Sequence, residues 1–226
     1  MINYSPSFLT EMIELTNFKV GVTLKELITL CRQAREGHFR EILVNSSQVR
    51  FCSEQLEESS VLVGSYVSFP LGQMSIPSKA FEVEDAISNG AKEVAYLPNL
   101  TQLKAGDLTY FSNEMGVVKE ICATRDIAST LILDVEVLTE KEIELAIQET
   151  LKIAPSMIQI NSGYNDESID FNTINLIKNL VQDTLPLKVA AVHFTAKELK
   201  QMKKLKINSF VTPSISEVKQ VLASLN

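Results

Sequence analysis

Polar side chains interrupt several short apolar runs of this sequence, and their types suit ligand binding or acid–base chemistry. Carboxyl groups and a lysine amine that converge in one place can orient a polar ligand and exchange protons with it. Because a charge buried without a partner costs free energy, such groups must be paired, hydrated or in contact with a ligand. The residues concerned are Glu14, Thr16, Asp134, Glu136, Gln159, Asn161 and Lys188.

These residues lie in short β-branched segments that alternate with longer amphipathic stretches. Apolar residues recur in the stretches at steps of three and four, which is typical of helices packed on one face. Ser/Thr-x-x-Glu motifs at Thr23, Thr139, Thr195 and Ser214 predict capping boxes at four helix starts. We predict eight strands, at residues 13–18, 40–45, 61–69, 93–97, 130–137, 157–161, 187–193 and 210–212.

The alternation of strands and helices predicts one α/β domain over residues 1–226, a single (β/α)8 TIM barrel. The rival arrangement is an open doubly wound sheet. Its strands would be covered on both faces and would read as continuous apolar runs, whereas here polar residues interrupt one face of the strands. The Gly-rich loops of nucleotide-binding folds are also missing from the sequence.

Side-chain alternation along each strand predicts which residues face the barrel axis. Leu131 and Leu133 form an apolar set with Val135, which must face the helices, so Asp134 and Glu136 point inward at the C-terminal mouth. The same reasoning turns the other five polar residues inward and puts Asn45 near the rim. Barrel enzymes keep their chemistry at this end, so a ligand site is favoured there over an ion cluster that merely satisfies itself.

Composition limits the partners. The 226 residues carry 21 Lys+Arg and 28 Asp+Glu, a formal charge of −7, which argues against a nucleic-acid binder. The chain has no apolar run of the ~20 residues that a membrane span needs. Its three cysteines are scattered and there are only two histidines, so we expect a reduced, cytoplasmic protein without a Cys/His metal site.

Several segments together resemble one known family. Phe69-Pro70-Leu71-Gly72, followed by Lys79, Glu82 and the block from Gly90 to Val94, is similar to deoxyribose-phosphate aldolase. The later segments follow in the family's order: 131–134, then Asn161-Ser162-Gly163-Tyr164, then 187–190. The likeness covers about residues 12–214. It implies a (β/α)8 class I aldolase that acts on 2-deoxyribose 5-phosphate through a lysine Schiff base.

The positions that the resemblance makes catalytic differ in this chain. The family's acid–base Asp corresponds to Ala95, and its Schiff-base Lys corresponds to Gln159. Only the second family lysine remains, as Lys188. An amide nitrogen is not nucleophilic and a methyl group cannot move a proton, so the usual aldolase mechanism is excluded on chemical grounds.

The phosphate grip that the resemblance implies is altered as well. The family's Gly-Gly after the seventh strand reads Ala191-Val192, and Pro213, which has no N–H, interrupts the grip after the eighth. Gly163 and Ser214 remain, and a helix N-terminus at Ser214 can still attract an anion.

Lys188 is the remaining candidate nucleophile. A Schiff-base lysine needs a free amine, which burial or a neighbouring cation supplies by lowering its pKa. Nearby carboxylates would instead keep Lys188 protonated, so an ion-pairing or substrate-binding role is favoured. His193 at a strand end is expected to be a rim residue and His38 a surface residue.

We therefore predict a diverged aldolase-like barrel that binds a small carbonyl or phosphosugar metabolite without ordinary turnover. The alternatives are an active lyase that uses Lys188 with Asp134 or Glu136 as proton carrier, and a non-catalytic scaffold. A homodimer is possible by analogy, and we predict neither a cofactor nor a metal, although Glu14, Asp134 and Glu136 could together hold a divalent cation. The expected substrate-binding residues are Glu14, Thr16, Asn45, Gln159, Asn161, Ser162, Gly163 and Ser214.

Overall fold

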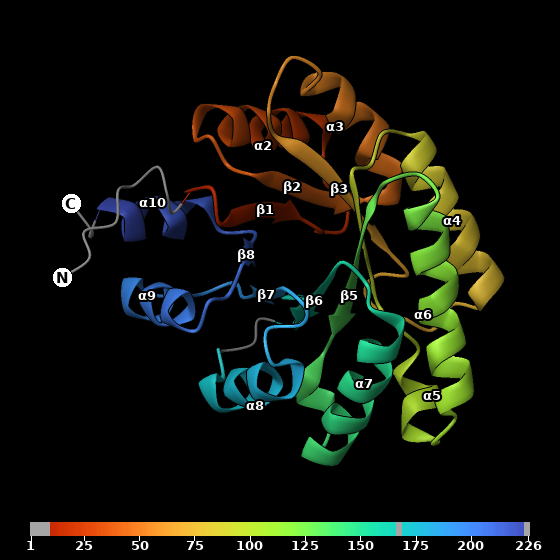
Figure 1. Cartoon of the computed structure of the whole chain (residues 1–226). Helices are drawn as coiled ribbons and strands as arrows, with labels where there is room; N and C mark the ends of the chain where they lie inside the picture. Colours follow the sequence, from red (N-terminus) through yellow and green to blue (C-terminus); the bar gives the residue numbers. More distant parts are fainter. Residues whose placement is uncertain (1–9, 166–168, 224–226) are drawn as a thin grey trace.

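A closed ring of eight parallel strands forms the centre of the molecule. The computed structural model describes residues 10–165 and 169–223. Each strand pairs with its neighbours in chain order, and the first pairs with the last, so the predicted (β/α)8 barrel is confirmed. Helices surround the ring of strands (Figure 1). The strands are β1 (Ile13–Asn17), β2 (Glu41–Asn45), β3 (Leu62–Val67), β4 (Glu93–Tyr96), β5 (Ala128–Leu133), β6 (Met157–Ile160), β7 (Leu187–Ala190) and β8 (Ser209–Thr212).

The helices follow the strands around the barrel. Within the described residues they are α2 (Leu24–Glu36), α3 (Val49–Gln55), α4 (Ile76–Ser88), α5 (Leu100–Lys104), α6 (Leu108–Ala123), α7 (Glu140–Ile153), α8 (Phe171–Val181), α9 (Ala196–Lys204) and α10 (Ile215–Ala223). Two short 3-10 turns, η1 (Ser46–Gln48) and η2 (Val135–Val137), follow β2 and β5. None of the described helices is both long and apolar enough to cross a membrane.

Three of the four predicted capping boxes are confirmed. Thr23, Thr139 and Thr195 each accept the N–H of a Glu three residues on, and that Glu bonds back to the cap. The fourth, at Ser214, is wrong. The carboxylate of Glu217 instead accepts the backbone N–H of Phe194 at 3.0 Å, so it ties α10 to the loop after β7.

The strands end earlier than the sequence pattern suggests. β5 stops at Leu133, and the next residues turn into η2 because the N–H of Val135 donates to Asn161 Oδ1 at 3.1 Å instead of extending the ladder. β7 likewise stops at Ala190, so His193 lies in the following loop. Side chains no longer alternate between two faces once the strand has ended. Glu136 lies beyond that point, so the prediction that it points inward does not hold.

The apolar residues of the strands divide between two cores. Those that face outward, such as Ile13, Leu131 and Ile158, pack with the helices in the main core, as alternation predicts. A smaller inner core lies on the barrel side of the strands and is flanked by Phe18 and Phe69. It consists of Leu43, Tyr66, Ala95, Leu97, Ile132, Ala190 and Val211.

Two anchors, the buried Lys79 and the half-buried Glu82, hold the loops at the C-terminal end of the barrel. The ammonium of Lys79 donates to the carbonyls of Gly72 and Leu97 and to Glu114 Oε1, each at 2.7 Å. The carboxylate of Glu82 accepts from Ser46 Oγ and from the N–H of Ser68, both at 2.8 Å. The family-like residues Lys79 and Glu82 therefore position the loops after β2, β3 and β4.

The Lys79 anchor can be tested directly. Lys79→Met removes the ammonium and leaves Glu114 as a buried carboxylate without its ion-pair partner, so we expect unfolding to become easier by about 3–5 kcal/mol. Lys92→Met, at an exposed lysine, should change stability by less than about 0.5 kcal/mol. Urea unfolding measures both, and equal effects of the two variants would contradict the anchor.

Candidate functional site

A buried ion cluster fills the N-terminal half of the barrel interior. The Lys188 ammonium lies 2.5 Å from Glu14 Oε2 and also bonds the carboxylate of Glu93. Arg40, the residue before β2, also belongs to the cluster. Its guanidinium lies 3.3 Å from Glu14 Oε1 and donates to Ser209 Oγ at 2.9 Å. The cluster joins residues of β1, β4, β7 and β8 with the start of β2.

The position of Glu14 and Lys188 along the barrel axis differs from the sequence prediction. Glu14 and Lys188 point inward as predicted, but both are second residues of their strands, so they lie near the N-terminal end and not at the C-terminal mouth. Alternation predicts the face that a side chain occupies and says nothing of its position along the barrel axis.

A third buried carboxyl group, Glu41, completes the cluster. Oxygen atoms of Glu14, Glu41 and Glu93 lie within 4.8 Å of one another. Both oxygens of Glu41 are buried without a hydrogen-bond partner, and a Cβ at Gly64 would lie 2.3 Å from Glu41 Oε1. Burial, followed by the charge of Glu93, raises the pKa of Glu41 well above its ordinary value. Because its neutral form is favoured, we expect Glu41 to carry a proton, which would leave the carboxylates of Glu14 and Glu93 to balance Lys188 and Arg40.

This charge balance determines what Lys188 can do. Burial alone would lower the pKa of Lys188, but the charges of Glu14 and Glu93 outweigh it and raise that pKa above the ordinary value. The three carboxyl groups are close enough for a metal ion, yet the ammonium already supplies the positive charge that they need.

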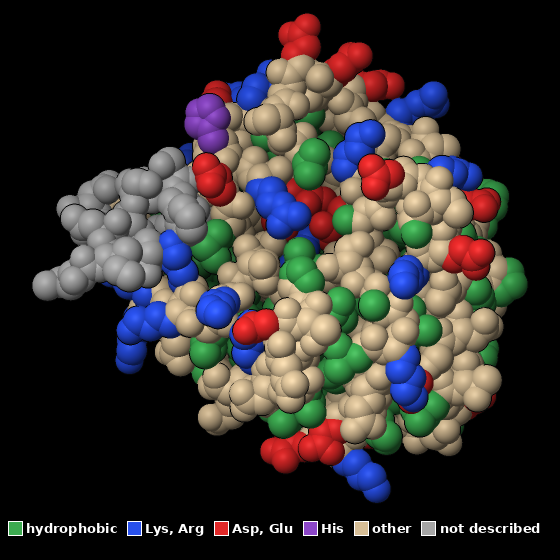
Figure 2. Space-filling view, viewed as in Figure 1, with side chains coloured by type: hydrophobic (Ala, Val, Ile, Leu, Met, Phe, Trp, Pro, Cys, Tyr) green, Lys and Arg blue, Asp and Glu red, His purple; other side chains and the backbone are tan. Residues whose placement is uncertain are grey.

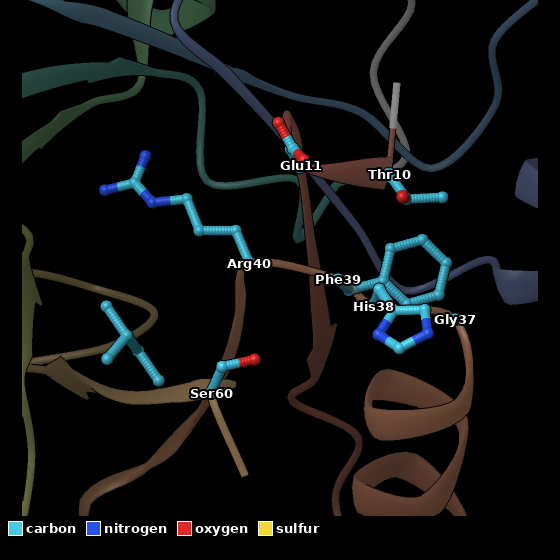
Figure 3. A pocket seen from close by; sticks show the side chains of 8 residues that line it. Thr10, Glu11, Gly37, His38, Phe39, Arg40 and Ser60 are labelled. Carbon is cyan, nitrogen blue, oxygen red and sulfur yellow. The ribbon is translucent and has the colours of Figure 1, made fainter. Parts of the chain in front are cut away.

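A pocket of about 750 Å³ opens at this N-terminal end of the barrel. Arg40, His38 and Phe39 line it, and the Arg40 side chain extends away from the other two (Figure 3). In the space-filling view, acidic side chains are visible inside a central hollow with basic side chains beside them (Figure 2). His38 is exposed, as predicted.

The C-terminal mouth has a different network. Asp134 Oδ1 accepts the N–H of Ser162 at 2.6 Å, and burial raises the pKa of Asp134. Gln159 donates its Nε2–H to the carbonyl of Asn161 at 2.9 Å, while its Oε1 is buried without a hydrogen-bond partner. The structure thus brings together Asp134, Gln159, Asn161 and Ser162, four of the predicted site residues.

One prediction for the mouth is wrong. Glu136 is exposed on η2 and does not point into the barrel, because the chain has left the strand. The three carboxyl groups that could have shared a cation, those of Glu14, Asp134 and Glu136, do not come together, since Glu14 is bound to Lys188 and Arg40 at the other end of the barrel.

The remaining predicted residues are spread around the mouth. Asn45 is the last residue of β2, and Thr16 donates its hydroxyl to the carbonyl of Leu43 at 2.8 Å. Gly163 adopts a φ of +76°, which favours glycine. Ser214 is half-buried before α10, and its N–H donates to Thr212 Oγ1 at 3.1 Å. The exposed ring of His193 contacts Glu217.

A pocket of about 360 Å³ lies over the loops that follow β3, β4, β5 and β6. Its floor includes Ile132, the register partner of Gln159 on β6. Beside it, the rings of Phe69 and Tyr66 lie 4.4 Å apart and the ring of Tyr164 packs 5.7 Å from Phe69. The mouth is therefore more apolar than the sequence analysis predicts.

Sequence reasoning missed three members of the ion cluster: Arg40, Glu41 and Glu93. Residues two positions apart on a strand point to the same face. Glu93 therefore shares the inward face of Ala95, and Glu41 shares that of Leu43, so alternation is a signal for both. Arg40 precedes its strand, and the sequence pattern has no signal for its contact with Glu14.

The proton on Glu41 gives a pH-dependent prediction. The unfolded chain releases this proton near the ordinary Glu pKa of 4.5, whereas the folded protein keeps it, so stability falls as the pH rises from 4.5 towards the raised pKa. Glu41→Gln removes this loss, and we expect stabilisation by about 1–3 kcal/mol at pH 7.5 and a smaller gain at pH 5.

Chemical unfolding at both pH values measures the effect, with Glu84→Gln at an exposed position of α4 as the matched control. Destabilisation by Glu41→Gln at both pH values would contradict this prediction.

Comparison with known proteins agrees with this architecture. Residues 8–159 match the family model described as DeoC/LacD family aldolase. A deoxyribose-phosphate aldolase of Lactobacillus acidophilus is 32% identical over 84% of this chain and 80% of its own length. One of Malacoplasma penetrans is 31% identical over 90% of this chain and 91% of its own length.

Solved structures show the same fold. The tetrameric deoxyribose phosphate aldolase of Aeropyrum pernix superposes with a TM-score of 0.90 at 19% identity, covering 98% of this chain and 94% of its own. On the strength of the family match and these relatives, the chain belongs to the DeoC/LacD aldolase family.

Proposed function

We propose that this protein binds a small hydroxylated or carbonyl metabolite at its C-terminal mouth and does not turn it over through a lysine Schiff base. The observation that carries the proposal is the position of Lys188, whose ammonium is held between Glu14 and Glu93. Imine formation requires the unprotonated amine, and each unit by which a pKa rises removes about nine-tenths of it.

The other buried lysine offers no substitute. Among the residues that the structure describes, the buried lysines are Lys79 and Lys188. Lys79 is bound to two carbonyl groups and to Glu114 outside the barrel interior. Neither amine is available for attack on an aldehyde.

Gln159 supports binding without covalent chemistry. Its carboxamide occupies the position that the family resemblance assigns to the Schiff-base lysine, and its Oε1 is a buried acceptor without a hydrogen-bond partner. A ligand hydroxyl could donate to this oxygen. Ala95, at the position of the acid–base Asp, lies in the apolar inner core and has no proton to move.

The geometry does not favour the alternative lyase built on Lys188. Lys188 lies in the N-terminal half of the barrel, whereas Asp134 follows the C-terminal end of β5 and Glu136 is exposed. A substrate carbonyl at Lys188 would be far from both proposed proton carriers.

Borohydride trapping tests the proposal. The protein is incubated with acetaldehyde or 2-deoxyribose 5-phosphate, reduced, and measured by intact mass, with the L. acidophilus relative treated in parallel as the positive control. We expect an unchanged mass for this protein, because both buried amines are engaged in ion pairs and hydrogen bonds. An adduct mapped to Lys188 would overturn the proposal.

A thermal-shift panel of small aldehydes, polyols and sugar phosphates separates a binder from a scaffold. We expect at least one compound to raise the melting temperature, since ligand bound to the native state stabilises it. No shift with any member of the panel would favour the scaffold alternative.

A further inference from the structure

We infer that the mouth selects an unphosphorylated, largely apolar compound that carries a hydroxyl or carbonyl group. This inference rests on the proposed function and specifies the class of ligand. It concerns the pocket of about 360 Å³ over the loops after β3 to β6, which we call the mouth pocket.

The walls of the mouth pocket are mostly apolar. Leu71 and Val137 stand at its rim with 74% and 52% of their surface exposed, an arrangement that a bound apolar group would cover. Leu97 and Ile132 form apolar parts of the lining deeper in the barrel. The volume falls at the lower end of the roughly 300–1,000 Å³ of small-molecule sites, so the ligand is small.

The polar groups of the mouth pocket suit a neutral ligand. Asp134 in the lining is a carboxyl group, which accepts from a ligand hydroxyl and repels a phosphate. Lys104 is the lysine of the lining, and its Nζ lies 3.3 Å from Glu142 Oε2. Its charge is therefore already balanced by a carboxylate of this chain.

Backbone N–H groups around the mouth are also engaged. A phosphate is usually gripped by several free N–H groups at loop and helix starts. Here the N–H of Ser162 donates to Asp134, and that of Phe194 donates to Glu217. The N–H groups of Tyr164 and Ser214 donate to the hydroxyls of Ser162 and Thr212.

Asp134 lies in the lining itself, so the chain supplies its own anion at the N–H of Ser162. A phosphate entering there would have to displace Asp134 and would meet the charge of the displaced carboxylate. Replacing charge-assisted hydrogen bonds in this way costs affinity, whereas an uncharged ligand needs no displacement.

Matched probes test the inference. We would titrate the protein, labelled with ¹³C at the methyl groups of Leu and Val, with benzyl alcohol, benzyl phosphate and 2-deoxyribose 5-phosphate. Benzyl alcohol should shift the signals of Leu71 and Val137, and each phosphorylated probe should bind at least about tenfold more weakly. A phosphorylated probe that binds more tightly than benzyl alcohol overturns the inference, and so does the absence of any shift.

Two substitutions sharpen the test. Leu71→Asp at the rim should weaken benzyl alcohol binding severalfold, whereas Phe81→Asp on α4, at a side chain that is 73% exposed, should leave it unchanged. Asp134→Ala removes a carboxylate from the lining and frees the N–H of Ser162, so it should strengthen benzyl phosphate binding severalfold. Equal effects of Leu71→Asp and Phe81→Asp would contradict the inference.

The two proposals fail separately. A borohydride adduct would refute the absence of imine chemistry whichever probe binds, and tight phosphate binding without an adduct would refute only the ligand class.

Discussion

The ammonium of Lys188, held between Glu14 and Glu93, is the interaction on which the interior of this barrel depends. A charge buried without partners costs several kcal/mol, so the two carboxylates and the amine must stay together. Arg40 adds a second positive charge beside Glu14. These contacts link residues of β1, β4, β7 and β8 with Arg40, just before β2, and they hold the amine of Lys188 in ion pairs.

The interior is thereby divided along its axis. Charged groups occupy the N-terminal half, and the apolar inner core with Tyr66 and Phe69 occupies the C-terminal half. Gln159 lies at the boundary, because its register partner on one side is Lys188 and on the other is Ile132. A neutral amide suits such a boundary, since a second ammonium at this position would add positive charge to a balanced cluster and would face an apolar layer.

Periodicity predicts the fold and, where a strand alternates clearly, the face that its residues occupy. Eight strands, three capping boxes and the outward set around Leu131 all follow from local patterns. Height along the axis depends on how neighbouring strands are staggered, and no local pattern contains that information. The end of β5 depends on the hydrogen bond from the N–H of Val135 to Asn161, residues 26 positions apart. A local pattern does not contain this contact, so it cannot predict that Glu136 lies beyond the strand.

The walls of the mouth share no residue with the ion cluster. Lys79 and Glu114 hold the loops after β3 and β4, Glu82 holds those after β2 and β3, and Asp134 holds the loop after β6. A change at the reactive position inside the barrel therefore leaves these loop contacts in place. Because the pocket is maintained by interactions that are independent of the amine, loss of imine chemistry does not entail loss of ligand binding. This separation supports the proposed ligand binding over an inert barrel.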